Sequence, residues 1–276
     1  MTMPELPEAE TICRSLRGRI KGKLIKAIKL FWPFLLKDTE PEALLRWTGT
    51  RLIQIRRRGK MILIDSDRQE TLLVHLKMTG QLYLAPSEVA RDKHVRLIIK
   101  FDDDNLELRF RDVRKFGYIK IFETPRENHV DPLNRLGPDP LDLSAGEFIS
   151  LFQGRKGRIK SLLLRQDFLA GLGNIYSDEI LFRAGINPER LTGSLSQKEL
   201  GRLYRAMIFV LAQAIKFRGT SVRDYRNGLG ETGGFQDHLR VYGREGERCY
   251  RCRQTIKRKK VGSRSTYFCP QCQPLG

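Results

Sequence analysis

Apolar side chains near the N-terminus follow a helical spacing. Ala9, Ile12, Cys13 and Leu16 occupy positions i, i+3, i+4 and i+7, which places them on one face of a helix. We therefore predict a short helix here, with Cys13 facing a hydrophobic core.

From Lys23 to about Glu123 the pattern changes to short apolar runs rich in β-branched residues. The runs are Leu52–Ile55, Met61–Ile64, Leu72–Val74, Val95–Ile99 and Leu106–Phe110. Short strands at this spacing are typical of antiparallel sandwiches. We predict an N-terminal antiparallel β-sandwich flanked by the first helix.

The pattern changes again after the strands. Residues 125–143 contain four prolines and little periodicity, the composition of a linker. Ser144 and Ser196 each precede a glutamate by three residues, which is the capping-box signature of a helix start. The second of these predicted helices has the apolar face Leu200, Leu203, Met207, Leu211 and Ala214 and stops near Gly219.

Two further segments complete the C-terminal half. A helix is expected to follow Gly171-Leu-Gly-Asn174, with Asn174 as its N-cap, and to end around Gly185. The Gly-rich stretch 219–247 is expected to be a long loop, and loops of that length are usually functional or mobile.

These patterns together predict an α+β protein. We expect a β-sandwich catalytic domain over residues 1–124, a linker over 125–143, a helical domain over 144–247 and a zinc finger over 248–276. The length of 276 residues is in keeping with more than one domain.

The charge balance points to a polyanionic partner. The chain has 51 Lys and Arg against 32 Asp and Glu, a net charge of +19, and the excess runs along its whole length. No apolar run approaches the ~20 residues of a membrane span. The acidic N-terminus is unlike a secretory signal, so we expect a cytoplasmic protein with no membrane partner.

Four cysteines near the C-terminus have the spacing of a zinc ribbon. Cys249 and Cys252 form one C-x-x-C pair, Cys269 and Cys272 form another, and sixteen residues separate the two pairs. Two disulfides are the alternative, which a cytoplasmic location disfavours. We predict one structural Zn²⁺ and a hairpin whose basic side chains hold phosphates.

Five motifs, in this order, resemble those of bacterial formamidopyrimidine-DNA glycosylases. They are Pro4-Glu-Leu-Pro-Glu8, Arg57-Arg-Gly-Lys60, Asp112-Val-Arg-Lys-Phe-Gly117, Gly171-Leu-Gly-Asn-Ile-Tyr176 and the zinc ribbon. The resemblance spans essentially the whole chain. It implies a helix-two-turn-helix domain, and a monomeric, nucleoid-associated enzyme that removes oxidised purines from duplex DNA and then nicks the abasic strand by β,δ-elimination.

The resemblance also assigns roles to individual residues. It implies Pro4 as nucleophile, Glu5 as general acid and base, and Lys60 and Arg264 as phosphate-binding residues that assist the chemistry. The implied DNA-binding residues are Glu8, Met78, His94, Arg114, Phe116, Arg155, Lys160 and Asn174. Among them Met78, Arg114 and Phe116 fill the gap left by the extruded base, and Thr220–Asn227 resembles the loop that closes over that base.

The residues themselves leave simpler interpretations open. Glu5 and Glu8 are also suited to the N-terminus of a helix, where carboxylates complement the macrodipole. Met78 and Phe116 would otherwise be read as core residues, and Lys60 as a solvated residue at a strand end.

The N-terminus departs from the family pattern. Pro4 follows Met1-Thr-Met3, and a proline nitrogen in a peptide bond is not a nucleophile. We therefore expect the working protein to begin at Pro4. Two alternatives remain. One is an endonuclease VIII-type enzyme for oxidised pyrimidines, whose motif usually has Gly at the position of Leu6. The other is a DNA-binding protein without enzymatic activity.

Overall fold

The computed structural model describes residues 3–102, 105–221 and 225–275. Within them the chain forms two compact units. One contains the residues up to Asn134 together with Phe217–Gly234, and the other contains Arg135–Lys216 together with the residues from Phe235 onward. A segment late in the sequence therefore folds with the N-terminal unit.

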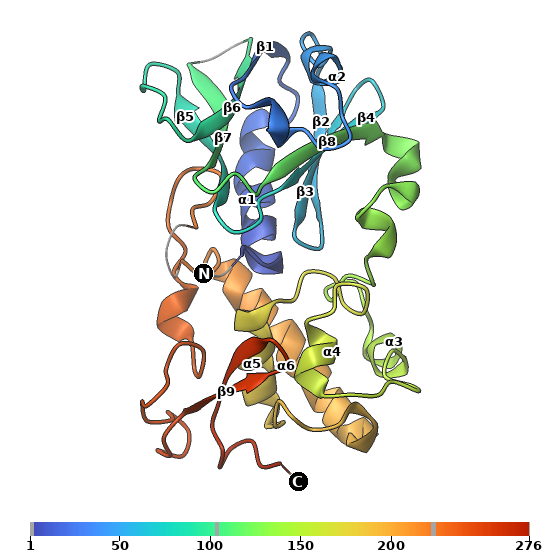
Figure 1. Cartoon of the computed structure of the whole chain (residues 1–276), viewed down its shortest axis with the longest axis vertical. Helices are drawn as coiled ribbons and strands as arrows, with labels where there is room; N and C mark the ends of the chain where they lie inside the picture. The colour runs from blue at the N-terminus through green and yellow to red at the C-terminus, as the bar shows by residue number, and fades with distance from the viewer. Residues whose placement is uncertain (1–2, 103–104, 222–224, 276) are drawn as a thin grey trace. The chain divides into compact units, whose positions relative to one another are not determined.

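The N-terminal unit contains two four-stranded antiparallel sheets (Figure 1). In spatial order the first comprises β1 (Ile25–Leu30), β6 (Val95–Phe101), β7 (Leu106–Asp112) and β5 (Gly80–Pro86). The second comprises β2 (Leu52–Arg58), β3 (Met61–Ser66), β4 (Glu70–His75) and β8 (Tyr118–Glu123). The predicted antiparallel sandwich and α+β class are confirmed.

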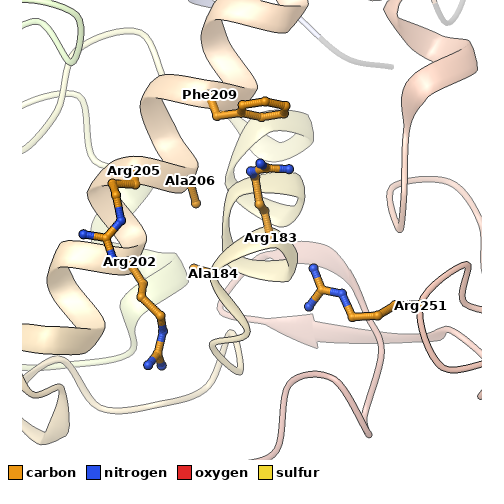
Figure 2. A pocket seen from close by; sticks show the side chains of 7 residues that line it. All are labelled: Arg183, Ala184, Arg202, Arg205, Ala206, Phe209 and Arg251. Carbon is orange, nitrogen blue, oxygen red and sulfur yellow. The ribbon is translucent and has the colours of Figure 1, made fainter.

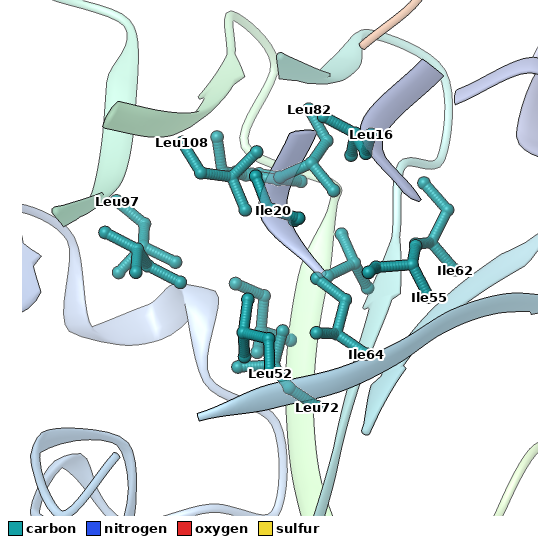
Figure 3. Packing of buried hydrophobic residues seen from close by; sticks show 14 of the residues in the cluster. Leu16, Ile20, Leu52, Ile55, Ile62, Ile64, Leu72, Leu82, Leu97 and Leu108 are labelled. Carbon is teal, nitrogen blue, oxygen red and sulfur yellow. The ribbon is translucent and has the colours of Figure 1, made fainter. Parts of the chain in front are cut away.

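Helix α1 (Leu6–Ile20) supplies the centre of this unit's core. Its predicted apolar face is fully buried, including Cys13. Leu16 and Ile20 pack against side chains of both sheets, as Figure 3 shows for Ile64 and Leu108. Burial raises the pKa of the Cys13 thiol to about 12, so this cysteine is an inert core residue at neutral pH.

Short elements connect the strands and lead out of the sandwich. They are η1 (Pro33–Leu35), α2 (Pro41–Leu45), η2 (Thr124–His129) and η3 (Leu133–Arg135).

Helices dominate the second unit. They are α3 (Ala145–Ser150), α4 (Ile159–Leu163), α5 (Asn174–Ala184) and α6 (Gln197–Lys216), with the short turns η4 (Thr192–Ser194) and η5 (Phe235–His238). Both predicted capping boxes form, because the Ser144 and Ser196 hydroxyls accept from the amides of Glu147 and Glu199. The predicted apolar face of α6 is buried.

The ends of two helices differ slightly from expectation. Helix α5 ends at Ala184, next to the predicted Gly185, which is its C-cap and whose φ of 70° suits glycine. Its N-cap, however, is the extended Gly173, and Asn174 is the first helical residue. Helix α6 ends at Lys216 rather than near Gly219.

Strands β9 (Lys257–Val261) and β10 (Arg264–Phe268) form the predicted C-terminal hairpin. None of the helices in the described ranges is both long and apolar enough to cross a membrane.

Candidate functional site

The first turn of α1 holds two buried carboxylates. Glu5 is the N-cap and Glu8 the third helical residue, and each is 2 % exposed. The Glu5 amide donates to Glu8 Oε2 at 2.8 Å, and the Glu5 side chain accepts from the Glu8 amide. This reciprocal capping box fixes the backbone that follows the buried Pro4.

Glu8 also holds a segment that lies 212 residues later in the chain. Its Oε1 accepts from the Thr220 amide at 2.7 Å, and the Tyr225 hydroxyl donates to its carbonyl oxygen at 3.3 Å. Gly219 has a φ of +82°, and a Cβ atom there would lie 2.9 Å from Glu8 Oε1. Glu8 therefore acts as a buried clamp, and this structure does not support the direct DNA contact predicted for it.

The predicted base-covering loop can be followed only in part. Residues 222–224 of Thr220–Asn227 lie outside the described residues. Just beyond its far end the Gly228 amide donates to the Ser15 hydroxyl of α1 at 3.0 Å. Thr220 and Gly228 are thus both hydrogen-bonded to side chains of α1.

Lys60 lies at the turn between β2 and β3 and is 8 % exposed. It contributes to a positive field around His75, a residue that the sequence analysis did not single out. Burial lowers the pKa of His75 to about 3, and the charges of Lys77, Lys60 and Lys37 lower it further. His75 is therefore neutral at physiological pH, and its Nδ1 accepts from the Lys77 amide at 3.0 Å.

The structure brings the three predicted gap-filling residues together. Arg114 Nη1 lies 3.4 Å from Met78 Sδ, and the Arg114 guanidinium carbon lies 4.5 Å from the centre of the Phe116 ring. Phe116 is 50 % exposed, so it is not the core residue that a solitary phenylalanine would suggest. An exposed apolar ring held in place by a neighbouring cation is suited to insert between DNA base steps as a wedge.

A buried carboxylate shapes the loop that presents this wedge. Asp112 is fully buried, and its oxygens accept from the amides of Arg114 at 3.1 Å and Gly117 at 2.7 Å. The Asp112 amide donates to the His94 carbonyl at 2.9 Å. The backbone of the predicted DNA-binding residue His94 is therefore joined to the same loop.

The predicted contact residues of the second unit differ in exposure. Arg155 is exposed, and its guanidinium carbon lies 5.8 Å from the Phe168 ring centre. Arg264 is exposed at the first position of β10. The Asn174 side-chain amide donates to the Ser265 carbonyl at 2.9 Å, which ties the start of α5 to the residue after Arg264.

Lys160, in contrast, is fully buried. Its Nζ lies 2.7 Å from Asp178 Oδ1 and donates to the Ser265 carbonyl at 3.0 Å and to Thr266 Oγ1 at 2.8 Å. A buried ammonium has no face for a phosphate, so the direct DNA contact predicted for Lys160 is not supported. The pair instead joins α4 and α5 to the β9–β10 hairpin.

We expect Lys160→Met to lower the free energy of unfolding by about 3–5 kcal/mol near pH 8, because it leaves a buried carboxylate unpaired. Burial already raises the pKa of Asp178 to about 7, and the Lys160 charge opposes this rise. An acid with a raised folded-state pKa binds more protons when folded, so stability falls as pH rises. Urea unfolding at pH 5.5 and pH 8 measures the difference from the parent protein.

The matched control is the double substitution Lys160→Met/Asp178→Leu, which removes both charges and should recover much of the loss. An equal loss for the single variant at both pH values would contradict the proposed role of the Asp178 charge.

The four predicted zinc ligands converge. All four Sγ atoms of Cys249, Cys252, Cys269 and Cys272 lie within 4.8 Å of one another. A tetrahedral ion with Zn–S bonds of about 2.3 Å needs sulfur atoms about 3.8 Å apart, and the structure has 3.9 Å for Cys249–Cys272 and 3.4 Å for Cys252–Cys269. All four are free thiols. The donor set is that of one structural zinc.

The hairpin beyond these ligands carries the basic side chains that the sequence predicted. Lys257, Arg258, Lys259, Lys260 and Arg264 are all exposed. Two of them already have carboxylate partners, since Lys259 pairs with Glu189 at 2.5 Å and Arg258 with Glu245 at 3.4 Å.

The purified chain should contain one zinc ion, measured by atomic absorption. Cys249→Ser should abolish stoichiometric zinc and make residues 248–276 sensitive to proteolysis, because the metal organises this segment. Cys13→Ser is the matched control, since Cys13 lies in the core of the other unit. Zinc retained by Cys249→Ser, or lost from Cys13→Ser, would refute the assignment.

Three family models match consecutive parts of this chain. Residues 3–119 match the formamidopyrimidine-DNA glycosylase N-terminal domain, and residues 136–226 match the formamidopyrimidine-DNA glycosylase H2TH domain. Residues 246–275 match the zinc finger found in FPG and IleRS.

Whole-chain comparisons agree with these matches. The formamidopyrimidine-DNA glycosylase of Heliobacterium modesticaldum is 46% identical over 279 residues, covering 98% of this chain and 100% of that protein. That of Carboxydothermus hydrogenoformans is 42% identical over 274 residues, with coverage of 98% and 100%. A Lactococcus lactis FPG mutant, solved in complex with DNA containing Fapy-dG, has a TM-score of 0.91 and 38% identity, with coverage of 98% and 100%. The chain belongs to the formamidopyrimidine-DNA glycosylase family and is a DNA glycosylase of the type that acts on damaged DNA.

Proposed function

We propose that this chain is a bifunctional glycosylase and abasic-site lyase that excises oxidised purines, including 8-oxoguanine and formamidopyrimidines, from duplex DNA. The supporting observation is that Pro4 directly precedes the buried Glu5, whose position is fixed by the Glu8 clamp. This arrangement places a proline nitrogen and a carboxylate in consecutive residues at the start of a rigid helix.

The chemistry of the proline amine supports its role as nucleophile. An α-amino group has a pKa near 7.7–8.0, against about 10.4 for lysine, so a larger share is neutral at physiological pH. Its lone pair forms a bond to the sugar C1′ while the glycosidic bond breaks and its electron pair leaves on the base, which takes up a proton. The attached nitrogen passes its own proton to the Glu5 carboxylate, and Glu5 then donates that proton to the ring oxygen O4′ as the sugar opens and the nitrogen becomes an iminium.

The iminium drives strand cleavage. Its positive charge makes the C2′ proton acidic, and removal of that proton expels the 3′ phosphate. A second elimination expels the 5′ phosphate, and hydrolysis of the remaining iminium frees the proline. No oxidant or metal is consumed, which agrees with a zinc site built of four thiolates, a type that is structural.

This mechanism requires a free nitrogen at Pro4. We propose that the working protein begins at Pro4 after initiation at Met3 and removal of that methionine. The N-terminal family model matches from residue 3, in keeping with this start.

Duplex DNA containing an oxidised base is the proposed partner, bound by a monomer in the bacterial nucleoid. Chains similar to this one have been solved with damaged DNA, including a Lactococcus lactis Fpg with DNA containing an abasic site, at 38% identity and a TM-score of 0.90. We propose Met78, Arg114 and Phe116 as the wedge that replaces the extruded base. The proposed contacts to DNA around it are Lys60, His94, Arg155, Asn174 and Arg264.

An endonuclease VIII-type preference for oxidised pyrimidines is the alternative activity. The juxtaposed Met78, Arg114 and Phe116, and Leu6 in the first motif, favour purines. If Pro4 is not the mature N-terminus, a DNA-binding protein without enzymatic activity is the alternative.

We expect the active protein to have the intact mass of a chain beginning at Pro4. Borohydride should trap it covalently on a duplex with 8-oxoguanine, because hydride reduces the iminium to a stable amine. Glu5→Gln should abolish base release, but this variant should still bind the same duplex. The control is Glu10→Gln, a carboxylate on the same helix that pairs with Arg14 and Arg57, which should retain base release and trapping.

Glycosidic cleavage by a protein that retains Thr2 would contradict the covalent mechanism, because its Pro4 nitrogen is in a peptide bond. A larger yield of trapped adduct with an oxidised pyrimidine than with 8-oxoguanine would favour the alternative activity.

Arg264→Ala should weaken DNA binding and reduce the slope of log Kobs against log[salt] by about 0.9, the value for one lost phosphate contact. Fluorescence anisotropy over a range of salt concentrations measures this slope. Arg165→Ala is the matched control, since Arg165 is exposed in the same unit and already pairs with Asp167 at 2.5 Å. Identical slopes for Arg264→Ala and the parent would remove the phosphate assignment.

A further inference from the structure

The second unit contains a cavity of about 570 Å³, within the range of roughly 300–1,000 Å³ typical of ligand pockets. Residues of helix α5 and helix α6 line it together with Arg251, which lies between Cys249 and Cys252 in the sequence, as Figure 2 shows. Its lining consists of Arg183, Ala184, Arg202, Arg205, Ala206, Phe209 and Arg251. Four arginines therefore line this cavity together with three apolar residues. We call this the arginine pocket.

The positive charge of the arginine pocket is poorly compensated. Arg202 has one carboxylate, that of Glu199, at 4.0 Å. Within residues 3–102, 105–221 and 225–275, the other three arginines form no ion pair with a carboxylate. Exposed arginines such as Arg165 and Arg218, in contrast, each pair with a carboxylate.

Aromatic rings hold two of these arginines in place. The Arg183 guanidinium carbon lies 3.4 Å from the centre of the Phe209 ring, and that of Arg251 lies 4.7 Å from the Phe182 ring. Stacking on a ring fixes the guanidinium plane while its N–H edges stay available. Edges of this kind bind carboxylates in bidentate geometry.

Arg183 lies in the positive field of two other arginines, and one of them, Arg251, also lines the pocket. Partial burial lowers the pKa of Arg183, and the charges of Arg251 and Arg240 lower it further. A bound anion would relieve this repulsion, because it adds the missing opposite charge.

The arginine pocket is separate from the proposed DNA contact at the start of α5. Asn174 is the first residue of that helix, and Arg183 follows nine residues later. At 1.5 Å per residue this is roughly 13.5 Å along the helix axis.

The shape of the pocket favours a peptide over a duplex. Duplex DNA presents its phosphates on a stiff convex surface, whereas a flexible chain can insert side chains into a concavity. Phe209, which is 44% exposed, and the two alanines offer an apolar surface that a phosphate backbone would not use. Acidic side chains next to an apolar one match both parts of the lining.

We propose that the arginine pocket is a docking site for an acidic peptide segment of a partner protein, with carboxylates on the arginines and an apolar side chain against Phe209. This site would recruit the glycosylase through residues other than those proposed to contact DNA.

The probe is a fluorescein-labelled peptide of sequence Glu-Asp-Phe-Glu-Asp-Leu-Glu, followed by anisotropy with the full chain. Replacing its acids with Gln and Asn should abolish binding. Arg183→Ala/Arg205→Ala should weaken peptide binding about tenfold or more. The affinity of Arg183→Lys/Arg205→Lys should lie between those of the parent and the double alanine variant, because lysine keeps the charge but lacks the bidentate fork. Arg14→Ala/Arg165→Ala, which removes equal charge from exposed positions, should bind like the parent.

Several outcomes would overturn the proposal. The first is that the parent does not bind the peptide, and the second is that both double alanine variants lose the same affinity for it. The third is displacement of the peptide by an undamaged 12-base-pair duplex, which would make the pocket a DNA contact. Zinc content and circular dichroism establish that the variants are folded. If the double variant does not fold, the single variants Arg205→Ala and Arg251→Ala, both at exposed positions, provide the same comparison. Because peptide binding is measured without a lesion, failure here leaves the proposed glycosylase mechanism intact.

Discussion

The Glu8 carboxylate is the interaction on which the N-terminal unit depends. One oxygen accepts from the Glu5 amide and the other from the Thr220 amide, so a single buried side chain fixes the start of α1 and attaches a segment from much later in the chain. A buried charge is costly unless it is hydrogen-bonded. Here backbone amides supply those bonds, and the bond from the Thr220 amide attaches the later segment to α1.

The second unit uses buried charge for the same purpose. The Lys160–Asp178 pair and the Asn174 amide both bond to residues of β10 next to Arg264. The zinc ligands hold the other end of that segment. An exposed cation is thereby presented on a rigid hairpin. In both units buried charged side chains position residues proposed to touch DNA: Asp112 accepts from the Arg114 amide in one unit, and Lys160 donates to the Ser265 carbonyl next to Arg264 in the other, as expected of preorganised sites.

The basic side chains behind the net charge of +19 lie in several kinds of environment. Some cations are neutralised by carboxylates, as Arg56 is by Asp65 and Glu127. Others stay exposed at proposed DNA contacts, and a third set forms the arginine pocket. Composition predicted a polyanionic partner correctly as a class of interaction, but it could not distinguish these sets, because pairing depends on which side chains meet in space.

The sequence by itself determined the local features: the amphipathic α1, the sandwich strands, both capping boxes, and the cysteine spacing. These depend on side-chain periodicity and on groups within a few residues of one another, so they can be read along the chain. Only the tertiary structure decided that Lys160 is buried, that Glu8 clamps a distant segment, that His75 lies in a field of lysines, and that four arginines share a pocket. Each of these depends on contacts between residues far apart in sequence, where burial and charge are set by neighbours that periodicity does not identify.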